Sequence, residues 1–248
     1  MESDIKIKSV PWLTIFTSPP VLAIVIGYFS SDFGEYILFT DTPTFLSSVL
    51  GYDFQTVAVS VLIMCILKPP FMVLSWKFMD FLIQRGYLCA LNTRKLYAIL
   101  ALGISAICFL TFGCASNNVH FLQCLLTIAF GLYVMADIGI LSNAIDLSPV
   151  YSGIITGVVM TTSSAAGFIG PSIVGLLTQD NNVLKQWSLM FTITAVVQIF
   201  GMIIYLMFAQ VEEQEWSSQE VVKNNGQKQE RSKLKISHDE EKASLINN

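Results

Sequence analysis

Six long apolar stretches constrain the fold of this chain more than any motif in it. They cover residues 20–40, 55–76, 96–113, 119–141, 153–178 and 187–208. A helix needs about 20 predominantly apolar residues to cross the hydrocarbon core of a bilayer. We therefore predict an all-α membrane protein in which the six stretches are six transmembrane helices.

The composition agrees with this class and excludes others. Hydrophobic residues make up 53% of the 248 and charged residues only 13%, whereas about a quarter of the residues in a soluble domain are charged. A net charge of −4 provides no basic face for phosphates, so we expect no nucleic-acid partner. The two histidines lie far apart and the five cysteines show no CxxC spacing. We therefore predict no enzyme active site, no metal site and no cofactor.

The placement of lysine and arginine predicts the orientation. Basic residues precede the first stretch, fill the loop between the second and third, and recur after the sixth, while the opposite loops contain only Lys185. Cytoplasmic loops carry an excess of these residues, so both termini are expected in the cytoplasm. The chain then divides into a cytoplasmic segment at 1–19, a six-helix bundle at 20–210 and a polar tail at 211–248. This tail contains too few apolar residues to fold, and we predict that it is disordered.

Two acids interrupt the first apolar stretch. Asp32, Glu35, Tyr36 and Phe39 recur at helical spacing, so they share one helix face. A charge inside a bilayer is costly and usually faces a cavity or a partner. Asp32 and Glu35 are therefore candidates for carrying a proton or a sodium ion in a coupled transporter. The alternative is that one or both extend to the exoplasmic boundary.

The second and fourth stretches also contain charges. Lys68 precedes Pro69 and Pro70, and prolines inside a helix remove backbone hydrogen bonds and favour a kink. Lys68 is expected either to bond the freed carbonyls or to pair with an acid such as Glu35 across the bundle. Asp137 is interpreted as a residue at the cytoplasmic boundary.

Small residues pattern the fifth stretch. Gly153 and Gly157 form a GxxxG spacing, and Gly170 is followed by Pro171. Such residues let helices approach closely, so we predict helix packing at the glycines and a bend at Gly170-Pro171. Bending helices are also used for alternating access in transporters, which is the second interpretation.

Short motifs occur in a fixed order from residue 10 to residue 216. They are VPWLTIFTSPPVLAI at 10–24, F-x-x-x-x-G-x-Y-x-L-x-T-x-x-P-T at 29–44, SWKFMDFLIQRG at 75–86, SNAIDLSPVYSGIITG at 142–157 and EEQEW at 212–216. Together they resemble the C-terminal six-helix half of a major facilitator superfamily transporter. More narrowly, they are similar to the anion:cation symporter family, whose members transport phosphate, sialic acid, glutamate or other organic anions.

The resemblance implies roles for particular residues. Tyr36 and Thr40 would line the substrate and ion pathway, where Asp32 or Glu35 would bear the coupling charge. Asp80 and Arg85 match the charged loop motif that forms a cytoplasmic gate in this family. Asn143 and Asp146 match a signature at the start of the fifth helix, where they are expected to cap that helix.

The implied function is cation-coupled symport of a small organic or inorganic anion by alternating access, driven by sodium or protons. Its setting would be the plasma membrane or an endolysosomal or vesicular membrane. Besides lipid, the expected partner is the missing N-terminal six-helix half or a related subunit. The alternative is a truncated, non-transporting membrane protein that assembles with or modulates a full-length relative. That alternative is motivated by departures from the family pattern, such as Val150 at a position where arginine is usual.

Overall fold

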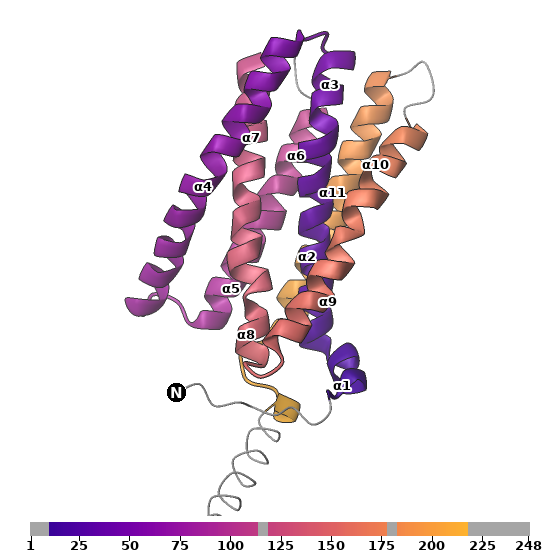
Figure 1. Cartoon of the computed structure of the whole chain (residues 1–248). Helices are drawn as coiled ribbons and strands as arrows, with labels where there is room; N and C mark the ends of the chain where they lie inside the picture. Colours follow the sequence, from indigo (N-terminus) through magenta and orange to yellow (C-terminus); the bar gives the residue numbers. More distant parts are fainter. Residues whose placement is uncertain (1–9, 114–118, 178–182, 218–248) are drawn as a thin grey trace, which may run out of the picture.

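The computed structural model describes residues 10–113, 119–177 and 183–217 (Figure 1). Every regular element in these ranges is a helix. Six helices are long and apolar enough to cross a membrane: Pro19–Ser48, Phe54–Gln84, Ala90–Thr111, Gln123–Leu147, Ser152–Leu177 and Lys185–Phe208. The prediction of an all-α membrane protein with six spans is confirmed.

Most spans are built from more than one helical segment. The first contains α2 (Pro19–Tyr36), η1 (Ile37–Asp41) and α3 (Thr42–Ser48), and the second is α4 (Phe54–Gln84). The third contains α5 (Ala90–Ala98), η2 (Ile99–Ile104) and α6 (Ser105–Gly113). The fourth contains α7 (Val119–Ala136), η3 (Asp137–Leu141) and α8 (Asn143–Leu147). The fifth consists of α9 (Ser152–Ser164) and α10 (Ala166–Leu177), and the sixth is α11 (Val183–Phe208). A short helix, α1 (Trp12–Thr17), precedes the first span.

The C-terminal end of the second span explains the role of the glycine that follows it. Pro69 and Pro70 lie inside α4, which nevertheless continues to Gln84. There, Gly86 adopts a φ of 69°, a conformation that favours glycine. Its amide donates to the Ile83 carbonyl at 3.0 Å, and the Tyr87 amide donates to the Leu82 carbonyl at 3.1 Å. This pair of bonds is a Schellman motif, which satisfies the last carbonyls of the helix. The glycine of the SWKFMDFLIQRG motif therefore ends the helix.

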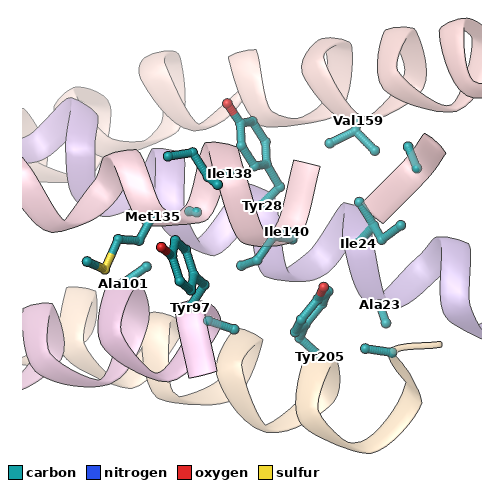
Figure 2. Packing of buried hydrophobic residues seen from close by; sticks show 14 of the residues in the cluster. Ala23, Ile24, Tyr28, Tyr97, Ala101, Met135, Ile138, Ile140, Val159 and Tyr205 are labelled. Carbon is teal, nitrogen blue, oxygen red and sulfur yellow. The ribbon is translucent and has the colours of Figure 1, made fainter. Parts of the chain in front are cut away.

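α2 lies at the centre of the bundle and packs against α7, α9, α10 and α11 (Figure 1). Two apolar cores surround it. One contains Ile24, Tyr28, Tyr97 and Tyr205 (Figure 2), and the other contains Phe33 and a group of aromatic rings around Phe191. α2 contributes Ile24 and Tyr28 to the first core and Phe33 to the second, so both halves of the helix are anchored in the interior.

The segment after α11 is structured as far as Ser217, although the disordered tail was predicted to begin at 211. The backbone N–H of Gln214 donates to the Leu147 carbonyl at 3.0 Å, and the Ser148 hydroxyl donates to the Ser217 hydroxyl at 2.9 Å. The rings of Trp216 and Tyr151 are 6.0 Å apart. Residues 211–217 therefore pack against the α8–α9 connection, and the rest of the predicted tail lies outside the described residues.

Candidate functional site

A cavity of about 430 Å³ opens between four spans of the bundle. Its wall comes from α2 and η1, from α4, from α9 and from the α7–η3 region. The lining residues are Tyr28, Asp32, Glu35, Tyr36, Phe39, Lys68, Phe130, Asp137, Met160, Ser163 and Ser164. Since all of these belong to candidate membrane spans, the cavity brings charged and aromatic groups together within the bundle.

An ion pair on the cavity wall joins α4 to α2. The Lys68 ammonium donates to the Glu35 carboxylate and lies 4.8 Å from the centre of the Phe130 ring. A cation over an aromatic face is stabilised by the negative potential of the ring. The prediction that Lys68 pairs with Glu35 across the bundle is confirmed. The alternative was that Lys68 bonds the carbonyls freed by Pro69 and Pro70. Among the described residues, its ammonium bonds Glu35 instead.

Asp137 lies in the cavity and accepts a hydrogen bond of 2.7 Å from the Tyr28 hydroxyl. Its interpretation as a residue at the cytoplasmic boundary is wrong. Asp137 begins the π-helical turn η3 and lies inside a span that continues to Leu147, so it is not at a helix end. The apolar stretch read from the sequence ended at 141, which made Asp137 look close to a helix end.

The helix face predicted in the first span is present. Asp32, Glu35, Tyr36 and Phe39 all line the cavity. Ser163 of α9 lines it too, and its hydroxyl donates to the Met160 carbonyl at 3.1 Å. Thr40, predicted as a fourth pathway residue, is exposed in η1 and is not part of this wall. Its neighbour Phe39, also in η1, continues the cavity face instead.

A buried polar group behind the cavity was not predicted. The Gln198 amide donates to the Tyr133 hydroxyl, and the Ser105 hydroxyl donates to the Gln198 carbonyl oxygen at 3.0 Å. A side-chain carbon at Gly34 would overlap Gln198 and Tyr133. The glycine next to Glu35 therefore lets α2 approach this group. The signal in the sequence was Gln198 itself, a polar residue inside the sixth apolar stretch.

Asp146 and Asn143 make side-chain contacts near the C-terminal end of the fourth span. Arg94 of α5 contacts Asp146 through two nitrogens, each at 3.0 Å, and the same guanidinium donates to the Ile138 carbonyl and the Ser142 hydroxyl. The Asn143 amide donates to the Tyr205 hydroxyl at 3.1 Å, and that hydroxyl donates to the Gly139 carbonyl at 3.2 Å. Arg94 and Tyr205 thus both bond carbonyls of η3.

The predicted capping of the fifth helix by Asn143 and Asp146 is wrong. Both residues face other partners, and α9 begins without a side-chain hydrogen bond from its N-cap residue. Instead the Tyr151 amide donates to the Ser148 hydroxyl at 3.1 Å. Arg94 was read from the sequence as a loop residue, whereas the third span begins at Ala90 and includes it.

The other candidate gate residues are exposed. Asp80 lies near the end of α4, and the Arg85 guanidinium lies 5.7 Å from the centre of the Phe81 ring. No ion pair joins Asp80 to Arg85 in the part of the chain that the structure describes. A gating role for this pair stays a prediction.

The glycines of the fifth span lie in two different environments. A side-chain carbon at Gly153 or Gly157 would meet nothing within 4 Å among the described residues, so these two glycines make no close helix contact within this part of the chain, and their packing stays a prediction. At Gly170 it would lie 3.2 Å from Ile37, which is close contact with η1. The helix of this span is interrupted at Ala165, between α9 and α10. The bend was predicted at Gly170-Pro171, but these two residues lie inside α10.

Comparison with known proteins matches this chain to membrane transporters. It is 30% identical over 210 residues to sialin from Homo sapiens and 31% identical over 213 residues to sialin from Ovis aries, each covering 85% of this chain and 42% of the relative. It is also 30% identical over 224 residues to vesicular glutamate transporter 3 from Danio rerio, covering 89% of this chain and 37% of that protein. This chain belongs to the anion:cation symporter family of the major facilitator superfamily.

The chain spans about two fifths of the length of the curated relatives it matches. That share is consistent with one six-helix half of a symporter of this family. No protein-family profile matches the chain.

The charged groups of the cavity wall are mostly acidic. Asp32, Glu35 and Asp137 contribute three carboxylates to its wall, against the single ammonium of Lys68. Such a wall favours cations, and an anion would meet repulsion at every position except beside Lys68. The cavity wall therefore carries more acidic than basic groups, and its one ammonium lies at Lys68.

Proposed function

We propose that this chain is the C-terminal six-helix half of a transporter that moves a small organic or inorganic anion together with protons or sodium. The observation that carries the proposal is the cavity, which gathers Asp32, Glu35, Asp137 and Lys68 inside membrane-spanning helices. Ionisable groups at this depth are costly and are retained chiefly along substrate and ion pathways. Family membership supports an anion as the substrate.

Alternating access is the proposed mechanism. In an apolar 18-residue window of each span, only 17% of α4 and 28% of the α9–α10 span is buried, against 61% in the first and fourth spans. α4 and α9 also form the sides of the cavity through Lys68 and Ser163. We infer that a second six-helix unit covers these faces and rocks against them, so that the cavity opens to one side of the membrane at a time.

Transport in proteoliposomes tests the proposal. The chain would be reconstituted alone and together with the N-terminal half of sialin, and supplied with radiolabelled glutamate, N-acetylneuraminate or phosphate. We expect accumulation driven by an imposed proton or sodium gradient, and its loss in the double variant Asp32→Asn/Glu35→Gln. Lys185→Gln, outside the cavity, serves as the matched control. Absence of uptake for all three anions in both preparations would reject the proposed function.

A second candidate is a non-transporting subunit that modulates a full-length relative. The exposed faces of α4 and α9–α10 favour it, because they offer the same surface to a complete transporter. Co-expression with sialin separates the two ideas. A modulator would co-purify with sialin and change its transport rate, whereas accumulation of substrate by this chain alone would exclude a purely modulatory role. The proposed site of action is the plasma membrane or a vesicular or endolysosomal membrane.

A further inference from the structure

We propose that Lys68 is the anion-binding residue of the cavity, and that an entering anion displaces Glu35 from Lys68 so that Glu35 takes up a proton. The inference rests on the proposed function and deepens it. It names the group that binds the anion, the acid that accepts the coupling ion and the identity of that ion.

The composition of the cavity wall selects Lys68. Among the described residues that line the cavity, it is the only basic one, beside Asp32, Glu35 and Asp137. An anion desolvated next to three carboxylates is strongly disfavoured unless a cation is in direct contact with it. A lysine ammonium has three donor hydrogens, so it can bind an incoming carboxylate or phosphate oxygen while Glu35 is still leaving.

The ion pair is accessible from the cavity. The Lys68 and Glu35 side chains retain 26% and 24% of their surface exposed, so an anion in the cavity can reach the ammonium without unpacking a helix. The Phe130 ring beneath Lys68 stabilises the ammonium through a cation–π contact of 4.8 Å. This contact does not depend on Glu35, so the ammonium stays in place when its carboxylate partner changes.

Glu35 is the acid that an anion would release. Asp137 already accepts a hydrogen bond from the Tyr28 hydroxyl, and Asp32 lies elsewhere on the cavity wall. Glu35 alone of these three bonds directly to Lys68. Once displaced, it would be a carboxylate without its counter-ion beside two others, a situation that favours protonation.

The charges balance in this exchange. The empty cavity holds the Lys68 ammonium paired with the Glu35 carboxylate. The loaded cavity holds the ammonium paired with the anion, and Glu35 as the neutral carboxylic acid. One anion with a single negative charge therefore enters with one proton, and the net charge of the cavity is the same before and after. Retaining this charge keeps the electrostatic cost of loading low.

Binding and proton uptake by the full chain in lipid nanodiscs test the inference. The probes are radiolabelled glutamate, N-acetylneuraminate and phosphate, and a pH indicator in weak buffer counts protons. We expect Lys68→Gln to weaken anion binding at least ~10-fold because a charge-assisted contact is lost, and Lys68→Arg to retain binding. Lys77→Gln, on the same helix but outside the cavity, is the matched control and should leave binding unchanged.

Glu35→Gln provides the sharper result. Without its competitor, Lys68 should bind the anion several-fold more tightly, and the uptake of about one proton per anion should disappear. The double variant Lys68→Gln/Glu35→Gln removes both charges of the pair, so it avoids an unpaired buried charge. It should fold and bind no anion, which keeps the test decisive if Lys68→Gln alone is unstable.

The outcomes separate the two proposals. If the wild-type chain binds none of the three anions, the proposed function fails and this inference falls with it. If the wild type binds an anion and the double variant binds it equally well, Lys68 is not the ligand, while the proposed function stands. If binding requires Lys68 but takes up sodium and no proton, the step assigned to Glu35 is wrong.

Discussion

Gly34 shows at the scale of one residue how the cavity is supported from behind. It precedes Glu35 on α2, and its backbone lies against the buried pair of Tyr133 and Gln198. A methyl group there would overlap atoms of both side chains, neither of which can move into solvent, because both are buried. The identity of residue 34 therefore affects where Glu35 sits.

The first prediction concerns this glycine. Gly34→Ala should lower the free energy of unfolding by about 1–3 kcal/mol because it overpacks a buried site, as measured by thermal unfolding in detergent. Gly157→Ala is the matched control, since its added carbon meets nothing within 4 Å, and it should cost nothing or stabilise by up to about 1 kcal/mol. Equal effects of the two substitutions would contradict the packing assigned to Gly34.

Single residues also mark the limit of what the sequence predicts. The cavity face of Asp32 and Glu35 was predictable because helical spacing is local. The pairing of Glu35 with Lys68 was predictable because a charge in a bilayer requires a partner. Tyr133 and Gln198 were not, because their contact joins two apolar stretches whose relative rotation is set by the whole bundle.

At the scale of elements, the π-helical turns are the least expected feature. η3 places Asp137 in the cavity, and its carbonyls at Ile138 and Gly139 accept hydrogen bonds from Arg94 and Tyr205. A π turn gains less from its internal hydrogen bonds than an α turn, so external donors stabilise it. Local apolar periodicity contains no signal for such a turn. The fourth helix was predicted too short for a different reason, because the apolar stretch ends at Leu141, before the more polar α8.

The second prediction tests the clamp formed by Arg94. A double-mutant cycle with Arg94→Gln and Asp146→Asn should give a coupling of about 1–3 kcal/mol, because the pair is hydrogen-bonded and partly buried. Amide hydrogen exchange at residues 138–143 should also accelerate in Arg94→Gln.

Lys95→Gln is the control, since Lys95 is adjacent in sequence and makes none of these contacts among the described residues. Exchange at 138–143 as slow in Arg94→Gln as in Lys95→Gln would show that Arg94 does not hold η3.

At the scale of the whole molecule, the number and order of spans followed from hydropathy alone. The orientation follows from a different property, the distribution of lysine and arginine, and it stays a prediction. The Cys89 thiol offers a direct test, because it is exposed at the start of α5, in the connection between the second and third spans.

The third prediction uses this thiol. In a variant with the other four cysteines replaced by serine, a membrane-impermeant maleimide should label Cys89 only after the cells are permeabilised, since its loop is expected in the cytoplasm. Asp53→Cys in a background without Cys89 provides the opposite control, because residue 53 lies in the connection between the first two spans. Labelling of Cys89 in intact cells would reverse the proposed orientation.

The π-helical turns have a consequence for how this chain tolerates changes in length. A π turn holds one residue more than an α turn. Loss of one residue from η3 can therefore convert it to α-helix and leave α7 and α8 in phase, at the expense of the position of Asp137. The same loss within α4 would rotate everything that follows by about 100° around the helix axis. Single-residue deletions should thus be survivable at η1, η2 and η3, and damaging in the continuous helices beside them.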